Sequence, residues 1–150
     1  MEKITQPAMY FFCREYRTTP PGMLAYVRHI PKELFAAAQQ FGLEIAGVMQ
    51  WHYQGFNPAS NEPFNLRIGI PVISPKPVLN PYKCIELPAF ECYAALHCGA
   101  WSEMLRSYSL IFNKLNDSGI QVSGETREQY LLCNFDREQD NLTYIQVGIK

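Results

Sequence analysis

The residues with the clearest chemical potential are a carboxylate and several aromatic side chains on two segments. Glu128 and Tyr130 alternate along SGETREQYLLC, and Trp51 and Tyr53 alternate along QWHYQ. Alternate residues of a β-strand share one face, so each pair would point to one side of a sheet. A carboxylate among aromatic rings loses hydration, and both its charge and the ring faces attract cations. We therefore expect a receptor for a flat or bulky lipophilic cation, in which burial raises the pKa of unoccupied Glu128.

The two segments belong to halves of the chain that resemble each other. FGLEIAGVMQWHYQ resembles SGIQVSGETREQYL, and LRIGIPV resembles YIQVGIK. This similarity indicates an internal duplication within a single domain over 1–150, with repeats at about 8–73 and 82–150. The proline-rich stretch SPKPVLNP joins the repeats and does not suit the interior of a helix or strand.

Superposing the repeats places Trp51 on Glu128 and Tyr53 on Tyr130. If the two strands meet across a pseudo-two-fold axis, these side chains form a concave surface with Glu128 inside. Met49 would share the face of Trp51 and Tyr53, because it precedes Trp51 by two residues. The alternative for the rings is ordinary core packing.

Each repeat has the pattern strand–helix–strand–strand. Strands are predicted over Ala8–Arg17, Met23–His29, Leu43–Gln54 and Phe64–Ile73, then over Tyr82–Cys98 with a bend at Pro88, Ile120–Phe135 and Leu142–Lys150. Helices are predicted from Pro31 to just before Gly42 and over Ala100–Asp117. In the second helix an apolar stripe is expected along Leu105, Tyr108, Ile111, Phe112 and Leu115, with Tyr108 and Phe112 as core residues.

Two further aromatic residues are candidates for the cleft. Tyr26 could reach it from the short strand of the first repeat, and Trp101 lies just inside the start of the second helix. Trp101 could instead serve as a packing anchor. With Met49, the candidate ligand-binding set is Glu128, Tyr130, Trp51, Tyr53, Trp101, Tyr26 and Met49.

Composition and spacing exclude several classes of function. The net charge is −1 with no basic stripe, which excludes nucleic acid as a direct partner. No apolar run reaches the roughly 18 residues of a membrane helix, so no membrane contact is expected. Five cysteines without a CxxC pair indicate reduced thiols of a cytoplasmic protein. No ligand spacing predicts a metal, no loop predicts a phosphate or other cofactor, and no triad involves His29, His52 or His97.

The segments IELPAFECYAALHCGAWSEM and REQYLLCNFD resemble GyrI-like small-molecule-binding domains. These domains are also the effector-binding domains of AraC- and MerR-type multidrug regulators. The matching features are Leu87-Pro88, the His97-x-Gly99-x-Trp101 step and the Glu128-x-Tyr130 strand, and the likeness covers about Tyr10 to Lys150. Two features depart from the family pattern. Ala100-Trp101 replaces the usual Pro-Tyr, which disfavours Tyr-dependent hydrolysis, and CNFDREQDN replaces an acidic-Pro loop.

The resemblance implies an α+β fold of two strand–helix–strand–strand modules related by pseudo-two-fold symmetry. Its antiparallel sheet would carry the helices on one side and a central ligand cleft. In multidrug-sensing relatives a cleft glutamate engages lipophilic cations, a role that falls on Glu128 here. We expect a stand-alone module without DNA-binding helices, and exposed sheet edges would allow a homodimer.

Two other functions stay open at the level of sequence. One is a GyrI-like hydrolase of electrophilic natural products, in which Glu128 activates water or protonates a leaving group. The other is a protein that binds gyrase or a regulator through a surface patch. Replacing Glu128 would abolish the hydrolase activity and leave such protein binding intact.

Overall fold

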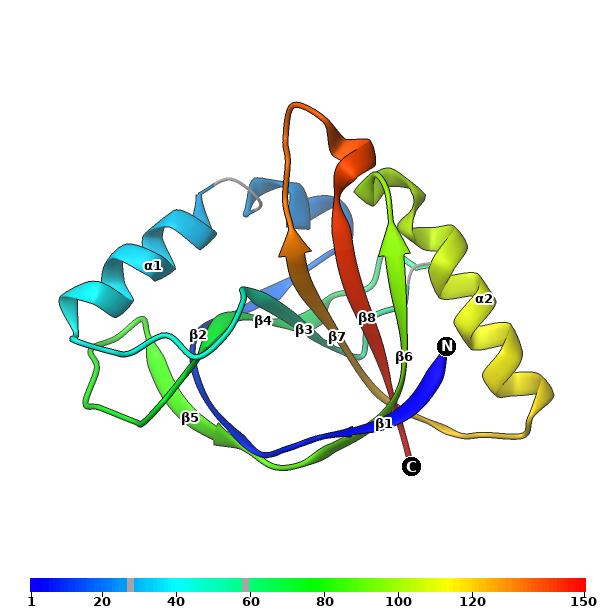
Figure 1. Cartoon of the computed structure of the whole chain (residues 1–150), viewed down its shortest axis with the longest axis horizontal. Coiled ribbons are helices and arrows are strands. Elements are labelled where there is room, and N and C mark those ends of the chain that lie inside the picture. Colours follow the sequence, from blue (N-terminus) through cyan, green and yellow to red (C-terminus); the bar gives the residue numbers. More distant parts are fainter. Residues whose placement is uncertain (27–28, 58–59) are drawn as a thin grey trace.

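The computed structural model describes residues 1–26, 29–57 and 60–150, and within them the chain forms eight strands and two α-helices (Figure 1). The strands are β1 Glu2–Gln6, β2 Met9–Thr18, β3 Gln50–Gln54, β4 Phe64–Val72, β5 Lys83–Leu87, β6 Phe90–Cys98, β7 Val122–Leu132 and β8 Leu142–Ile149. The α-helices are α1 Ile30–Gln40 and α2 Met104–Asp117, and short 3-10 helices cover η1 Pro21–Ala25, η2 Trp101–Glu103 and η3 Glu138–Asp140.

All eight strands belong to one antiparallel sheet with the order β1-β6-β8-β7-β3-β4-β2-β5. The order is symmetrical about the central pair β7–β3. On one side of this pair lie β8 and β6, and on the other side lie β4 and β2. The edge strands are exchanged, because β1 precedes β2 in the chain but pairs with β6, whereas β5 precedes β6 but pairs with β2. The predicted pseudo-two-fold arrangement of two modules is therefore present.

The register of the central pair places the symmetry axis at the predicted site. In β3 and β7, Trp51 stands directly opposite Glu128. The similarity between the repeats also equates Trp51 with Glu128. A residue can face its own counterpart only where the axis passes between the two, so the axis passes through this cross-strand pair.

Both helices cover the same face of the sheet. Trp51, Glu128 and Ile145 are cross-strand neighbours on β3, β7 and β8, and so they share one face. Trp51 belongs to the core cluster that includes Leu34 of α1, and Ile145 belongs to the cluster that includes Ile111 of α2. The helices therefore bury their apolar stripes on the face that carries Glu128, with α1 and α2 over opposite halves of the sheet (Figure 1).

The short strand predicted over Met23–His29 is wrong. Pro21–Ala25 forms the 3-10 helix η1, and His29 lies in a turn, whereas residues 27 and 28 are outside the described residues. Pro20 and Pro21 explain the difference. Proline has a φ suited to the first turn of a helix and lacks the N–H that a strand ladder needs.

Two other strand boundaries differ from expectation. The strand predicted over Leu43–Gln54 is regular only over Gln50–Gln54, and Ile45 makes a single bridge to Val72. Pro71 of β4 accepts a hydrogen bond from the Ala46 N–H at 2.9 Å, but proline has no N–H of its own to continue the ladder on this side. The edge strand β1 was not predicted, because EKITQ has too few apolar residues for a clear alternation.

The apolar stripe of α2 is shifted by one residue at its start. Met104, Tyr108, Ile111 and Leu115 are buried, whereas Leu105 is 61% exposed. The α-helix begins after the 3-10 turn η2, and from that start the positions 104, 108, 111 and 115 fall on one face. The helix itself was predicted correctly, and Tyr108 is brought over the sheet.

We predict that Gly69→Ala destabilises the protein by about 3 kcal/mol, because the new methyl group would overpack the interior. A Cβ at Gly69 would lie 2.5 Å from the carbonyl oxygen of Phe12 and 2.7 Å from side-chain atoms of Phe11 and Cys13. Urea unfolding followed by circular dichroism measures the loss.

Gly119→Ala is the matched control. Gly119 has a φ of 67° and open space around its Cα, so the substitution carries only the backbone strain of about 1 kcal/mol. A loss of stability at Gly69 no larger than that at Gly119 would contradict the packing described for β2 and β4.

Candidate functional site

Glu128 lies at the centre of the molecule on β7. Its side chain points to the face covered by both helices, and only 5% of the residue is exposed. A carboxylate removed from water in this way needs hydrogen-bond donors or a positive charge. The residues around Glu128 supply three donors.

Three tyrosine hydroxyls donate to the Glu128 carboxylate. Tyr53 of β3 donates to Oε2 at 2.7 Å, and Tyr108 of α2 donates to Oε1 at 2.5 Å. Tyr130, two residues further along β7, also donates to Oε2. The carboxylate is thus held by the two central strands and by the helix that crosses above them.

Aromatic rings surround this hydrogen-bonded centre. The Tyr130 ring is packed edge-on between two indoles, with its centroid 6.1 Å from that of Trp51 and 6.1 Å from that of Trp101. Trp51 also packs against Tyr53, at 6.5 Å. The indole N–H of Trp101 donates to Thr143 Oγ1 of β8 at 3.2 Å, which fixes the orientation of the ring. Edge-on contacts of this kind are the preferred geometry for aromatic pairs.

Burial raises the pKa of the Glu128 carboxyl, and the hydrogen bonds from Tyr108, Tyr130 and Tyr53 act against this shift. The nearby His97 acts in the same direction as these hydrogen bonds. Burial and the nearby Glu128 charge hold the pKa of all three tyrosines well above the ordinary value. The hydroxyls therefore stay protonated and can act as donors at any pH at which the protein works.

The structure brings together five of the seven residues predicted for the site: Glu128, Tyr130, Trp51, Tyr53 and Trp101. Met49 is buried in the α1 core cluster, and its carbonyl oxygen accepts a hydrogen bond from the Tyr130 N–H at 3.1 Å. Tyr26 stacks on Tyr16 at 4.6 Å and packs on the same α1 cluster. Their part in ligand binding stays a prediction.

Tyr108 is the residue that sequence reasoning assigned to the core alone. Its position on the apolar stripe of α2 was recognised, and the ring is indeed buried. The apolar pattern does not show what the Tyr108 hydroxyl contacts, but a tyrosine on a buried stripe needs a hydrogen-bond partner for its O–H group. A search for an acceptor within reach of the helix would have pointed to Glu128.

The aromatic rings close over the carboxylate. Trp51 and Tyr53 are 5% and 4% exposed, whereas Tyr130 and Trp101 are only partly buried, so the cover is less complete on their side.

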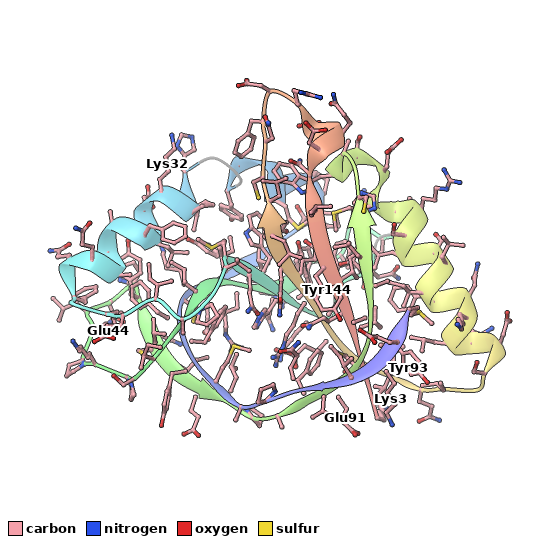
Figure 2. The ribbon with its side chains drawn as sticks, in the orientation of Figure 1. Lys3, Lys32, Glu44, Glu91, Tyr93 and Tyr144 are labelled. Carbon is pink, nitrogen blue, oxygen red and sulfur yellow. The ribbon has the colours of Figure 1, made fainter. Side chains whose placement is uncertain are left out.

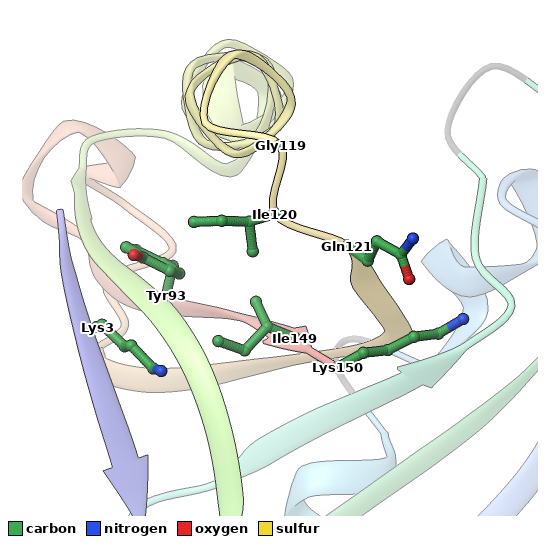
Figure 3. A pocket seen from close by; sticks show the side chains of 7 residues that line it. All are labelled: Lys3, Tyr93, Gly119, Ile120, Gln121, Ile149 and Lys150. Atoms are coloured by element: carbon green, nitrogen blue, oxygen red, sulfur yellow. The ribbon is translucent and has the colours of Figure 1, made fainter.

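Two cavities lie away from Glu128. One, of about 400 Å³, is bordered by Lys3, Tyr93, Gly119, Ile120, Gln121, Ile149 and Lys150 (Figure 3). The other, of about 510 Å³, includes Gln50 and Gln129 in its lining, and neither cavity is lined by Glu128. Because Glu128 is 5% exposed and its oxygens are held by three tyrosine hydroxyls, we expect a ligand that contacts it to displace aromatic side chains.

The described part of the chain offers neither a metal centre nor a membrane-spanning helix. Among residues 1–26, 29–57 and 60–150, no group of three His, Cys, Asp or Glu side chains is arranged to hold a metal ion. In the same ranges no helix is long and apolar enough to cross a membrane. His97 contacts Ser107 Oγ at 2.7 Å and the Ala100 carbonyl oxygen at 2.9 Å. These contacts anchor the start of α2 to β6.

We predict that wild-type protein loses stability relative to Glu128→Gln as the pH rises. The folded-state pKa of Glu128 is raised, so the neutral carboxyl is favoured in the folded chain. Below the ordinary carboxyl pKa, the difference in the free energy of unfolding between the two proteins is therefore constant. As the pH rises from that value to the folded-state pKa of Glu128, the free energy of unfolding of the wild type falls relative to that of Glu128→Gln. Above the folded-state pKa the difference is constant again. Urea unfolding of both proteins between pH 4 and pH 8, as approximate limits around that window, measures the trend.

Glu91→Gln is the control, because Glu91 is an exposed glutamate at the surface (Figure 2). Its replacement should leave the pH dependence unchanged. If the free energy of unfolding of Glu128→Gln changed with pH in parallel with that of the wild type, the buried carboxyl with a raised pKa would be contradicted.

We also predict that Tyr108→Phe costs about 1–3 kcal/mol at neutral pH, because the ring stays in place while a donor to the carboxylate is lost. The same change should raise the pKa of Glu128 further, so the loss should shrink at acidic pH. Thermal unfolding at two pH values measures both effects. Tyr93→Phe, on the same face of the sheet but without a hydrogen bond to Glu128, should show neither effect.

No protein-family model matches the sequence, and no curated protein does either. Solved structures match it over nearly the whole chain. A structure of EcmrR bound to DNA superposes with a TM-score of 0.86 at 14% identity, over 99% of this chain and 56% of that one. The isolated C-terminal domain of EcmrR superposes with a TM-score of 0.80 at 13% identity, over 99% of this chain and 96% of the domain. The chain thus spans just over half the length of the EcmrR chain in the DNA complex.

Two further matches have lower scores. SAV2435, solved with bound tetraphenylphosphonium, has a TM-score of 0.68 at 10% identity, over 100% of this chain and 94% of that one. A hydrolase from Listeria innocua, encoded by lin2189, has a TM-score of 0.62 at 13% identity, over 99% of this chain and 91% of that one. At these identities the matches establish the fold. The chain has the α+β fold of the EcmrR C-terminal domain, and its resemblance to GyrI-like domains is confirmed at the level of fold.

Proposed function

We propose that this protein binds lipophilic cations, with Glu128 as the counter-ion. The observation that carries the proposal is a carboxylate that is 5% exposed and is held by three tyrosine hydroxyls inside an aromatic cluster. These groups need not be there for folding, because an apolar side chain of similar volume would avoid the cost of burying a carboxyl. The retained charge therefore supports a role in binding.

The chemistry of the cluster favours a particular class of ligand. A cation that enters beside Glu128 neutralises its carboxylate. The faces of Trp51, Tyr130 and Trp101 add cation–π attraction of roughly 0.5–2 kcal/mol each. A small, strongly hydrated cation would lose too much hydration in such a place. A bulky cation with delocalised charge loses little and also buries apolar surface.

The partly buried side of the cluster offers the way in. Trp101 contacts both Tyr130 and Phe135, with ring centroids 6.1 Å and 5.4 Å apart. Phe135 is 45% exposed and follows β7 in the connection to β8. Outward movement of Trp101 and Phe135 would uncover Tyr130 and then Glu128. The strands β3 and β7, which carry the other rings, would stay in register.

The comparisons support the same proposal by analogy. SAV2435 shares the fold and binds tetraphenylphosphonium, a bulky aromatic cation of the expected class. EcmrR shares the fold and was solved in complex with DNA, so sensing is a candidate role beside sequestration.

A hydrolase is the second candidate, and two observations favour it. The raised pKa of Glu128 suits a general acid or base, and the Listeria innocua protein of the same fold is called a hydrolase. Turnover of an electrophilic substrate that is lost in Glu128→Gln would decide for this function. Cation binding without turnover would decide against it.

We predict that tetraphenylphosphonium quenches the tryptophan fluorescence of the wild-type protein with saturation, because Trp51 and Trp101 border the site. Glu128→Gln should weaken the binding at least about tenfold, equivalent to about 1.4 kcal/mol. Affinity for the wild type should also rise with pH as the Glu128 carboxyl ionises, and the Gln variant should lack this dependence.

Triphenylphosphine oxide is the matched neutral ligand, since it presents similar rings without a charge. It should bind both proteins weakly and with equal affinity. Equal affinity of tetraphenylphosphonium for the wild type and for Glu128→Gln would overturn the proposed role of the carboxylate.

A further inference from the structure

The reverse face of the sheet is a second interior. Arg127 and Gln129 flank Glu128 on β7, so their side chains point away from the helices. In the view of Figure 1, the β1–β2 and β5–β6 connections pass below the central strands of the sheet. The sheet therefore curls around its reverse face. Phe11, Cys13 and Leu87 are buried there as a separate apolar cluster.

Three polar residues form a row across the floor of this concave face. His52, Arg127 and Gln146 are cross-strand neighbours on β3, β7 and β8, and they are 2%, 2% and 0% exposed. Phe11 stacks on the His52 imidazole with centroids 4.4 Å apart, and the guanidinium of Arg127 lies 3.9 Å from the centre of the Phe90 ring. The row is thus enclosed by aromatic side chains on its open side.

The hydrogen-bonding capacity of the row is only partly used. Arg127 Nε donates to Glu125 Oε1 at 2.8 Å, but Arg127 Nη1 has no partner among the described residues. Neither amide atom of Gln146 has a partner within the same part of the chain. Buried polar groups in folded proteins are nearly always paired, and a buried guanidinium is the most costly group to leave open. Adjacent open donors on two strands therefore indicate a binding position.

His52 contributes an acceptor to the same place. Its Nε2 contacts Gln50 Oε1 at 2.8 Å, and the amide oxygen can only accept, so Nε2 carries the hydrogen. Burial, followed by the charges of Arg127 and Arg67, holds the pKa of His52 well below its ordinary value. The imidazole is therefore neutral, and its Nδ1, unpartnered among the described residues, is an open acceptor.

The charges on this face favour an anion. One positive charge is in excess, because the register brings four cations and three carboxylates to this side: Arg17, Arg67, Lys83 and Arg127 against Glu2, Glu15 and Glu125. Arg67 and Lys83 share Glu15, at 3.0 and 2.9 Å, whereas Arg127 has Glu125 on one side only. The charges of Arg127 and Arg67, which add to the effect of burial in lowering the pKa of His52, would stabilise a bound negative charge.

A cavity of about 510 Å³ opens near one end of this row, although His52, Arg127 and Gln146 themselves do not line it. Its lining includes Gln50, whose side chain contacts His52, and Gln129, which lies two residues from Arg127 on the same strand face. Two residues along a strand span about 7 Å. The remaining walls are largely apolar and include Met9, Val48, Pro71 and Val72.

We propose that the concave face holds a second binding site, for a small aliphatic carboxylate. Arg127 Nη1 and the Gln146 amide donate to its oxygens, and its hydrocarbon part occupies the cavity beside Gln50 and Gln129. A monoanion fits better than a dianion, because only one positive charge is in excess. The site lies behind Glu128 and is independent of cation binding on the helix-covered face.

The test is an NMR titration of ¹⁵N-labelled full-length protein with butyrate at constant ionic strength. The Arg127 Nε–H and Gln146 side-chain amide signals should shift with saturation. Acetate should bind more weakly than butyrate, because it leaves the cavity empty, and neutral butyramide should cause no saturable shift. Absence of a saturable butyrate shift would mean that water alone satisfies these groups, and the proposal would be overturned.

Gln146→Leu is the variant that tests the position, since it removes the amide and leaves an apolar group of similar size. It should weaken butyrate binding at least about tenfold, as expected for loss of a hydrogen bond to a charged group. Gln121→Leu makes the same change at an exposed glutamine and should leave the affinity unchanged. Equal affinity of Gln146→Leu and wild type would overturn the assignment. If Gln146→Leu does not fold, the comparison of butyrate with butyramide on the wild type still decides.

Discussion

The structure depends on one constraint: the carboxylate of Glu128 has been removed from water, so its oxygens need hydrogen-bond donors from the protein. Glu128 stands at the symmetry axis of the fold, where β3 and β7 meet and where both helices end their cover of the sheet. Its charge can be tolerated there only because Tyr53, Tyr108 and Tyr130 aim their hydroxyls at it. Each donor comes from a different element, so the carboxylate also ties the two central strands to α2. A group that costs stability thereby fixes the relative position of the two modules.

The central strand β7 serves two unlike interiors. Its residues alternate between the helix-covered face, with Glu128, and the concave face, with Arg127. The first interior is aromatic and holds a carboxyl whose pKa is raised by burial, and the second contains a buried guanidinium whose hydrogen bonds are incomplete among the described residues. The opposite charges on consecutive residues are separated by the sheet itself, and no ion pair between Glu128 and Arg127 occurs among the described side chains. The face with Glu128 therefore favours a cation, and the face with Arg127 favours an anion.

Much of this arrangement could be predicted from sequence, because it follows from two simple periodicities. Strand alternation put Glu128 and Tyr130 on one face, and the similarity between the repeats placed Trp51 at the matching position. Together they implied the central pairing that the register shows. The first helix was predicted from Pro31, the Ala-rich sequence and Gly42, and the second from its apolar stripe, although the phase of α2 was misjudged at Leu105.

The remaining features depend on packing that no local pattern records. Tyr108 reaches Glu128 only because of the way α2 crosses the sheet, so its role was hidden behind that of a core residue. The sequence pattern places Arg127 on the face opposite to Glu128 but does not indicate that Arg127 and Gln146 are buried, since charged and polar residues in a strand usually lie in solvent. They are buried because β1, β2, β5 and β6 curl around that face, a long-range effect of the exchanged edge strands.

The central claim is that Glu128 is a buried acid held ready for a cation. Its pKa can be measured directly by ¹³C NMR of the glutamate δ-carbons, with Glu128→Gln to assign the signal, in the absence and presence of tetraphenylphosphonium. The account predicts a pKa above the ordinary glutamate range in the free protein and a marked decrease when the cation is bound. An ordinary pKa that the cation leaves unchanged would contradict it.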